Sequence, residues 1–403
     1  MDYSFPIGER NVVFIFKHSI NVFCVTLMCL LSGLSSADIG VIPKEKETFD
    51  SYISRVQLFL ESNKRIINGD NKQAEIAAVM PYEYLPSNNC KGRSVGLLLS
   101  HGLSDSPYGL RALSRELSQA CVHVRVVLLP GHGSAAEDLI EVRRQDWQQT
   151  FNRSAMALKN DVEFLYVGGF STGGALALQF TQEHSTVVEG VVLFSPLLKI
   201  NSSIDWLSPI LEPVVTWLDH EESDDYAKYG SIPVSAITQA YKTAKEIRRS
   251  LVEKPLTNVP VFIALAEEDA TVDSSVTRNV FDQFLTHPRG QMVMYSSQSE
   301  DRYEGRMRVI NAYLPEQRIT GLSHTSIHGS PNDAHYGKKG DYRICDFISD
   351  EHDFTRCKTE NSIWFGEKGE RLSSKSSYGA RITWNPYFDE LIKDVVQFIQ
   401  PNS

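Results

Sequence analysis

The chain has 403 residues, 42% hydrophobic and 22% charged, which is enough apolar material for a large buried core. Its formal net charge of −10 argues against a nucleic-acid partner, because nucleic-acid-binding domains carry basic surfaces. The length allows one large domain or two or three smaller ones, and no internal repeat or low-complexity tract is present.

The first element in chain order is an N-terminal apolar segment. Residues 20–37 are apolar after Lys17 and His18 and end in small residues, which predicts a signal peptide over residues 1–37. The apolar run has about 15 residues, fewer than the ~20 that a spanning helix needs. We therefore expect export to the periplasm or beyond. An uncleaved membrane anchor and a buried helix remain as alternatives.

Four of the six cysteines lie outside this segment: Cys90, Cys121, Cys345 and Cys357. An even number of cysteines in an exported chain favours disulfides, and four cysteines allow three connectivities. We predict the sequence-local pairs Cys90–Cys121 and Cys345–Cys357. The alternative is four reduced, buried thiols in a cytosolic protein. The spacing is not of the zinc-binding type, so no metal site is predicted.

Residues 38–403 are predicted to form a single α/β domain that starts with a helical lead-in and a short extended segment near residue 84. Short apolar runs then predict buried strands at residues 95–100, 122–130, 164–169, 190–196, 259–266 and 291–297. Helical patterns follow at residues 106–119, 147–160, 171–184, 276–287 and 387–399. This alternation predicts βαβ units and a mainly parallel sheet flanked by helices.

Two stretches interrupt the alternation. Residues from about 196 to 258 predict a helical cap inserted above the sheet, and residues from about 325 to 383 predict an irregular insertion rich in glycine, serine and charge.

The sequence Gly169-Phe170-Ser171-Thr172-Gly173 matches the pattern G-x-S-x-G between a predicted strand and a predicted helix. A sharp strand-to-helix turn strains the backbone of its central residue and needs small neighbours two positions away. Such a turn exposes the hydroxyl of Ser171 as a nucleophile and directs the amide of Thr172 toward the same point. The alternative is a glycine-rich turn in which Ser171 only caps the helix.

A serine nucleophile needs a base to take its proton, and an acid to orient that base. The segment "FIALAEEDATVD" places carboxylates just after a buried strand, and we choose Asp269 as the acid. Three neighbouring carboxylates are the alternatives: Glu267, Glu268 and Asp273.

The base is expected to follow the acid in the chain. His324 in "ITGLSHTSIH" comes after a short extended segment and lies in a predicted loop, so we choose it. His328 and His335 fall deeper in the irregular insertion. The alternative is that His324 has only a structural role.

Hydrolysis of an acyl group also needs donors for the oxyanion. The amides of Leu103, which follows His101-Gly102 at the end of a strand, and of Thr172 are the candidates. His101 and His132 are expected to support these loops structurally.

The motifs "SHGLSDSP", "LLPGHG", "GGFSTGG", "LAEEDATVD" and "GLSHTS" occur in this order from about Val95 onward. Together they resemble the α/β-hydrolase superfamily, and within it the serine aminopeptidase-type, lysophospholipase- and monoacylglycerol-lipase-like group. The resemblance implies an acyl-enzyme mechanism at Ser171, Asp269 and His324 with oxyanion donors Leu103 and Thr172. It implies no metal and no organic cofactor.

We therefore expect a carboxylic-ester hydrolase acting on lipid-like or monoacyl substrates, with possible association with a membrane surface. Apolar cap residues are expected either to line an acyl pocket or to pack the cap onto the sheet: Trp206, Leu207, Ile210, Val214, Val215 and Trp217. The alternatives are an aminopeptidase-type amide hydrolase, whose amine pocket the acidic run 219–225 would supply, and a noncatalytic binding protein. The sequence predicts no oligomeric state.

Overall fold

The computed structural model describes residues 38–400, except residues 88, 91, 93, 219, 221 and 222. The predicted signal peptide or anchor, with Cys24 and Cys29, lies outside the described residues. Within the described part of the chain, no helix is long and apolar enough to cross a membrane.

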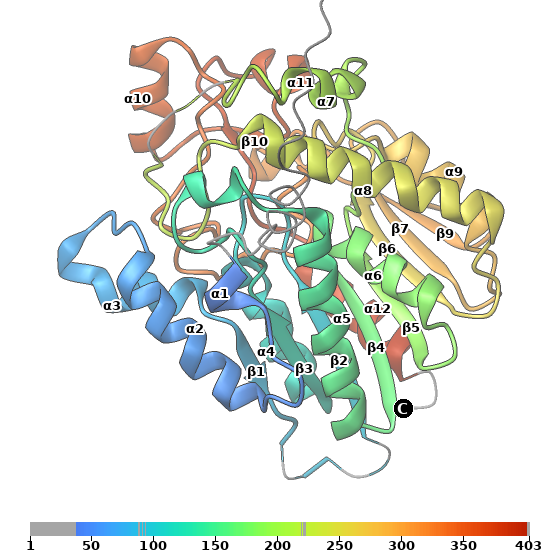
Figure 1. Ribbon diagram of the computed structural model, residues 1–403. Helices are drawn as coiled ribbons and strands as arrows, with labels where there is room; N and C mark the ends of the chain where they lie inside the picture. Colours follow the sequence, from blue (N-terminus) through green and yellow to red (C-terminus); the bar gives the residue numbers. More distant parts are fainter. Residues whose placement is uncertain are drawn as a thin grey trace, which may run out of the picture. The chain divides into compact units, whose positions relative to one another are not determined.

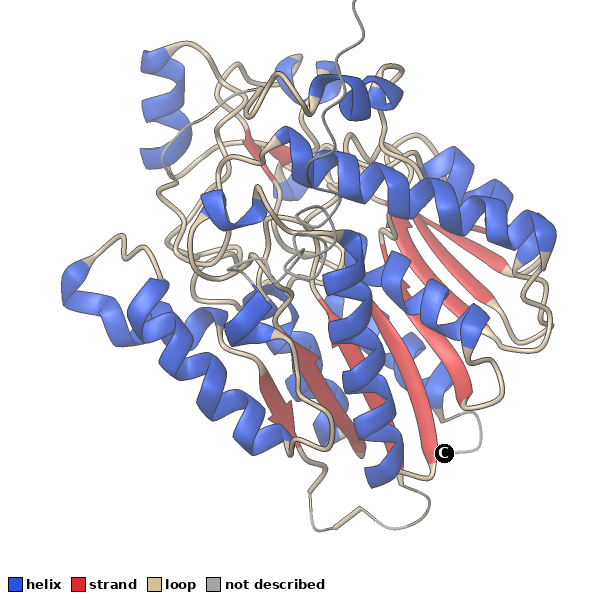
Figure 2. Ribbon diagram, in the orientation of Figure 1, coloured by secondary structure: helices blue, strands red, loops and turns tan. Residues whose placement is uncertain are grey.

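A nine-stranded sheet forms the centre of the fold, with strand order β1-β3-β2-β4-β5-β6-β7-β9-β8 (Figure 2). Its strands are β1 (Tyr82–Tyr84), β2 (Val95–Ser100), β3 (Val122–Val127), β4 (Phe164–Phe170), β5 (Val188–Phe194), β6 (Val261–Ala266), β7 (Gln291–Ser296), β8 (Arg302–Glu304) and β9 (Met307–Asn311). The two edge strands, β1 and β8, pair antiparallel, and all other neighbours pair parallel. The α/β-hydrolase fold predicted from the sequence is confirmed.

The central strands are continuous apolar runs because helices cover both faces of the sheet. Every residue of β3 and β6 is buried. In the register of β2 and β4, Ser100 lies opposite Gly169, so the carboxyl ends of these strands meet at one edge. Ligand sites of open parallel sheets form at that edge.

Helices connect the strands and cover the sheet (Figure 1). They are α1 (Asp38–Val41), α2 (Phe49–Asn63), α3 (Lys72–Val79), α4 (Arg111–Gln119), α5 (Arg144–Asp161), α6 (Thr172–Glu183), α7 (Ser208–Leu211), α8 (Val234–Glu253), α9 (Ser274–Phe284), α10 (Glu351–Thr359), α11 (Glu370–Ser373) and α12 (Phe388–Ile399). The buried side chains of α2, α5, α6, α8 and α9 join one apolar core, and those of α4 and α12 join the core on the opposite face.

Helix α12 illustrates how the sequence specifies this packing. Phe388, Leu391, Val395 and Phe398 recur every three or four residues and are buried, while Asp389 and Glu390 in the first turn complement the helix dipole. The spacing forms one apolar stripe, which covers the sheet.

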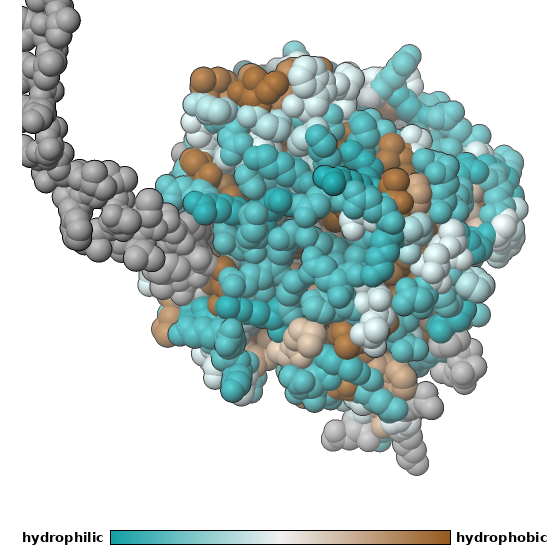
Figure 3. All heavy atoms as spheres, turned by 45° about the vertical axis from the view of Figure 1, so that its right-hand side comes forward, coloured by the Kyte–Doolittle hydropathy of each residue, from teal (hydrophilic) through white to brown (hydrophobic). Residues whose placement is uncertain are grey.

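The cap contains α7 and α8, and α8 packs its buried face on α6. The two roles predicted for the apolar cap residues are both wrong for Trp206, Ile210 and Val214, which are 54%, 61% and 79% exposed. Leu207, Val215 and Trp217 are partly buried, and none of the six lines the cavity described below. Helix α7 has only four residues, too few to form a buried stripe. Figure 3 shows a largely hydrophilic face that carries separate apolar patches.

The insertion at 325–383 is more ordered than the sequence predicted. It contains α10, α11 and a parallel pair of short strands, β10 (Phe365–Gly366) and β11 (Ala380–Arg381). The predicted pair Cys345–Cys357 is a disulfide and packs with Ile363 and Ala380 in a small core. The predicted pair Cys90–Cys121 is also a disulfide, and it ties the loop before β2 to the start of β3. Figure 1 shows α7, α10 and α11 together above one end of the sheet.

Candidate active site

Ser171 occupies the predicted sharp turn between β4 and α6. Its φ and ψ angles are 52° and −114°, a strained conformation for a residue with a side chain. A Cβ added at Gly169 would lie 2.4 Å from the carbonyl oxygen of Ser100, and one added at Gly173 would lie 2.1 Å from the same atom. The two glycines are therefore needed because the turn passes directly over the end of β2.

His324 and Asp269 are in direct contact. The Nδ1 atom of His324 lies 2.7 Å from Oδ2 of Asp269, and both side chains are buried. The other carboxylate oxygen, Oδ1, accepts hydrogen bonds from the amides of Thr271 at 2.7 Å and Val272 at 2.9 Å. Burial by itself raises the pKa of Asp269, but the charge and hydrogen bond of His324 and the two amides lower it below its ordinary value.

The three alternative carboxylates have other partners. Glu267 accepts a hydrogen bond from the hydroxyl of Ser296, and Glu268 accepts bonds from the amide and hydroxyl of Ser297 at 2.9 and 2.7 Å. Asp273 caps α9 by accepting a bond from the amide of Val276 at 3.1 Å. Asp269 is thus the acid of this loop that contacts the predicted base.

A cavity of about 680 Å³ brings the other predicted residues together: Ser171, His324, Leu103 and Thr172 all line it. The ring of Phe170 lies 4.7 Å from that of His324, centre to centre, and supports it from one side. Thr172 is the first residue of α6, where backbone N–H groups have no partner within the helix. Asp269 does not line the cavity and lies behind His324.

His101 and His132 hold the loop that carries Leu103, in the structural role that the sequence predicted. His101 donates from Nδ1 to the carbonyl oxygen of Gly102 at 2.8 Å and accepts at Nε2 from the amide of Leu129 at 3.1 Å. His132 accepts at Nε2 from the amide of Ser104 at 3.2 Å. Burial lowers the pKa of His101 well below its ordinary value and that of His132 to about 4, so both rings stay neutral.

The wall of the cavity combines apolar and polar side chains. Its apolar lining residues are Leu103, Ala112, Phe170, Leu197, Ile200, Ile232, Ile237 and Ala240. Its polar lining residues include Asp105, Asp225, Lys228, Tyr336, Tyr342 and Lys358. Burial raises the pKa of Asp105 to about 7. The cavity therefore offers both an apolar surface and hydrogen-bonding groups to a ligand.

Several of these cavity residues were not identified from the sequence. Tyr336, Tyr342 and Lys358 come from the 325–383 insertion, and no motif marks them. His328, which the sequence analysis set aside, lies beside Phe170 with ring centres 4.4 Å apart, and burial lowers its pKa to about 3.

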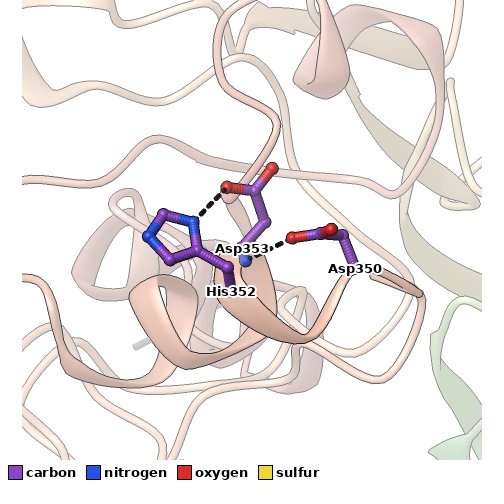
Figure 4. Close-up of side chains that lie close together, drawn as sticks. All are labelled: Asp350, His352 and Asp353. Carbon is purple, nitrogen blue, oxygen red and sulfur yellow. Dashed lines mark hydrogen bonds and ion pairs between the residues drawn. The ribbon is translucent and has the colours of Figure 1, made fainter.

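One surface group resembles a metal site at first sight. Asp350, His352 and Asp353 place ligand atoms within 4.8 Å of one another at the start of α10 (Figure 4). Asp350 already caps the helix by accepting from the amide of Asp353 at 2.9 Å, and the side chain of His352 is 80% exposed. Helix capping explains this arrangement, and we assign no metal to it.

A serine on a strained turn at the carboxyl end of a parallel sheet, with a histidine–aspartate pair on later loops, is the architecture of an α/β hydrolase. The family model described as "Alpha/beta hydrolase family" matches residues 97–334, more than half of the chain. The chain therefore belongs to this family, as its motifs predicted.

Among curated proteins, the chain is similar to the thermostable monoacylglycerol lipase of Bacillus sp. (strain H-257), with 31% identity over 111 residues. That match covers 28% of this chain and 42% of that enzyme, so it spans less than half the length of the relative. The similarity agrees with the predicted monoacylglycerol-lipase-like group.

Among solved structures, the chain is similar to one from the work on LipS and LipT, two metagenome-derived lipolytic enzymes. The TM-score is 0.48 and the identity 19%, and the match covers 59% of this chain and 91% of that one. The monoacylglycerol lipase of Paleococcus ferrophilus has a TM-score of 0.44 and 14% identity, with coverage of 58% and 90%.

Proposed function

We propose that the protein is a serine hydrolase that cleaves carboxylic esters of lipid-like or monoacyl compounds through an acyl-enzyme. The observation that carries this proposal is the His324–Asp269 hydrogen bond of 2.7 Å behind a cavity that Ser171 also lines. Membership in the α/β-hydrolase family and the similarity to a monoacylglycerol lipase support it.

The proposed reaction has two steps, acylation of Ser171 and hydrolysis of the acyl-enzyme, and the same groups act in both. His324 takes the proton of Ser171 as the serine oxygen attacks the ester carbonyl, and the amides of Leu103 and Thr172 stabilise the oxyanion. The protonated imidazole then gives its proton to the leaving alcohol, and water repeats the sequence on the acyl-enzyme. Asp269 holds the imidazole with Nδ1 protonated.

The two kinds of cavity wall support a monoacyl ester as the substrate. The aliphatic side chains of Leu197, Ile232 and Ile237 suit an acyl chain, because removing apolar surface from water stabilises the complex by about 25 cal/mol per Å². The hydroxyl groups of Tyr336 and Tyr342 donate to Asp225 at 2.6 Å and Asp224 at 2.8 Å, and each oxygen can still accept a hydrogen bond from a polar leaving group.

Aminopeptidase-type hydrolysis is the second candidate, because Asp224 and Asp225 of the acidic run line the same cavity. Both carboxylates already have partners. Asp224 pairs with Lys358 at 2.7 Å, and Asp225 accepts bonds from His335 at 3.0 Å and Tyr336 at 2.6 Å. A substrate amine would have to compete with these contacts, which favours ester over amide substrates.

We also propose that the protein is exported, because its two disulfides are typical of oxidising compartments.

Association with a membrane surface is a further proposal, supported by exposed apolar cap residues: Ile204, Trp206, Ile210, Val214 and Leu218. Co-sedimentation with phospholipid vesicles, comparing wild type with Trp206→Ser, tests it. Equal sedimentation of the two proteins contradicts this role for the cap.

A substrate panel tests the proposed reaction. Purified wild type and Ser171→Ala are offered short-chain p-nitrophenyl esters, monoacylglycerol, lysophospholipid and aminoacyl anilides. We expect ester cleavage by the wild type and a loss of at least ~10⁴-fold in Ser171→Ala, because no other group supplies the attacking oxygen. Cleavage of anilides alone supports the peptidase. No cleavage of any substrate supports a noncatalytic protein.

A further inference from the structure

Two charged residues of the insertion, Glu367 and Arg381, form a largely buried pair next to the candidate active site. Their side chains are 6% and 10% exposed, and Nε of Arg381 lies 2.7 Å from Oε1 of Glu367. Replacing a buried ion pair by apolar residues is often neutral or stabilising, so stability alone is weak grounds for such a pair.

The contacts of Glu367 connect the two loops that carry the acid and the base. Its Oε2 accepts a hydrogen bond from the backbone amide of His324 at 3.0 Å and one from the backbone amide of Ala270 at 3.2 Å. Ala270 directly follows Asp269. A single carboxylate oxygen therefore ties the backbone of the base to the backbone next to the acid.

Arg381 holds this carboxylate in place and extends the connection. Its Nη2 donates to Oε2 of Glu367 at 2.9 Å and to the hydroxyl of Thr271 at 2.8 Å. The backbone amide of Arg381 donates to the carbonyl oxygen of Ile344 at 3.0 Å, next to the disulfide-bonded Cys345. The pair is thus fixed both to the acid loop and to the core of the insertion.

The two loops come from distant parts of the chain, since Asp269 follows β6 and His324 lies 55 residues later. Arg381 lines the cavity that holds Ser171, but Glu367, within the described residues, does not and instead lines a second cavity, with Glu268 and Lys375. Its influence on the reaction therefore passes through the positions of Asp269 and His324 rather than through contact with substrate.

We propose that Glu367, held by Arg381, is a positioning residue that sets the distance and orientation between Asp269 and His324. This inference rests on the proposed serine-hydrolase function. It gives the 325–383 insertion a role in assembling the catalytic groups, because Glu367 directly follows β10 and Arg381 ends β11. A misplacement of about 1 Å between catalytic groups costs on the order of 10²-fold in rate.

The test compares Glu367→Ala and Glu367→Gln with the control Glu83→Gln. Glu83 forms a comparable partly buried pair with Arg125 at the β1 edge of the sheet. We expect kcat for a p-nitrophenyl ester to fall roughly 10²-fold in Glu367→Ala, with KM within about twofold. Glu367→Gln keeps an oxygen that can accept hydrogen bonds from the two backbone amides but loses the charge that pairs with Arg381. Its kcat should therefore lie between those of Glu367→Ala and the wild type. The control Glu83→Gln should have a lower melting temperature than the wild type but an unchanged kcat.

A second measurement does not depend on activity. The Nδ1 proton that His324 shares with Asp269 should give a downfield proton NMR resonance, assigned by its loss in His324→Gln. We expect this resonance to shift or broaden in Glu367→Gln and to stay unchanged in Glu83→Gln.

A folded Glu367→Gln with wild-type kcat and an unchanged downfield resonance overturns the proposal, and this variant decides the matter if Glu367→Ala does not fold. If the wild type cleaves no ester and is not labelled by a fluorophosphonate, the proposed function fails. The resonance then still shows whether Glu367 positions the histidine–aspartate pair.

Discussion

The hydrogen bonds of Asp269 explain why a carboxylate, with two accepting oxygens, is needed at this position. Asp269→Asn keeps an oxygen for the amides of Thr271 and Val272 but turns an amide NH₂ toward Nδ1 of His324. That nitrogen must then accept, which moves the imidazole proton to Nε2. An imidazole protonated at Nε2 cannot accept the proton of Ser171. We expect kcat to fall on the order of 10⁴-fold.

The matched control for this change is Asp273→Asn, four residues further on, because Asp273 caps α9 and contacts Ser275 and Lys199 rather than His324. The control should lose a little stability and retain kcat. Steady-state kinetics on one ester at pH 7.5 distinguishes the two variants. A kcat for Asp269→Asn within tenfold of wild type contradicts the role of Asp269.

The sequence predicted the residues that its motifs mark. Ser171 and Asp269 follow predicted strands, and His324 follows a short extended segment. The structure brings Asp269 and His324 into contact and places His324 in the same cavity as Ser171. Glu367 and Arg381 lie in a stretch without periodicity, and their contacts are made only after the insertion folds back. No pattern in the sequence connects such residues to the acid and base loops.

At the scale of elements, the turn between β4 and α6 leaves no room for an added methyl group at Gly173. A Cβ there would lie 2.1 Å from the carbonyl oxygen of Ser100, a backbone atom that cannot move away freely. We expect Gly173→Ala to lower the free energy of unfolding by about 2 to 4 kcal/mol and to reduce kcat strongly, because the turn must shift.

Gly174→Ala is the control for this substitution. Its Cβ would lie 3.1 Å from the Cβ of Pro196 and from the carbonyl oxygen of Gly169, a tight contact that small shifts relieve. Urea unfolding and ester kinetics on both variants test the difference. Equal effects of the two substitutions contradict the account of this turn.

Elements with clear periodicity were predicted well, and short ones were not. The six predicted strands are present with slightly different ends. Strand β9 was missed because Met307–Asn311 is only five residues long, includes Arg308, and follows the short edge strand β8 rather than a helix. In the cap, apolar composition suggested burial, but Trp206 and Val214 lie in short or irregular segments that present them to solvent.

For the whole molecule, the buried histidines predict sensitivity to acid. His101, His132 and His328 have pKa values lowered by burial, so the folded protein keeps them neutral while the unfolded chain protonates them below about pH 6.5. Each contributes stability that is present at neutral pH and lost as the pH falls. Asp105 has the opposite effect, because burial raises its pKa to about 7. Its carboxyl group binds one proton in the folded protein that the unfolded chain releases, so its contribution to stability increases as the pH falls.

These four groups together give a linkage of about two protons, so through them the free energy of unfolding should fall by roughly 3 kcal/mol per pH unit from about pH 6 to pH 4. Urea unfolding at half-unit steps measures this slope. In His328→Gln the slope should be shallower by roughly 1.4 kcal/mol per unit. A slope near zero over this range, or stability that rises toward acid, contradicts the assignment of neutral buried histidines.

The two disulfides were also predicted, because sequence-local pairing needs no knowledge of the fold. The contacts of Glu367 in the 325–383 insertion were not predicted, since they are made with loops distant along the chain: 97 residues separate Ala270 from Glu367.

The most direct test of the central claim is to trap the acyl-enzyme site chemically. The folded protein is treated with a fluorophosphonate probe, digested, and mapped by mass spectrometry, with Ser171→Ala and His324→Ala treated in parallel. The account predicts one modified peptide, carrying the label on Ser171 in the wild type, none in Ser171→Ala, and strongly slowed labelling in His324→Ala. Labelling that persists in Ser171→Ala, or that maps to another serine, would contradict it.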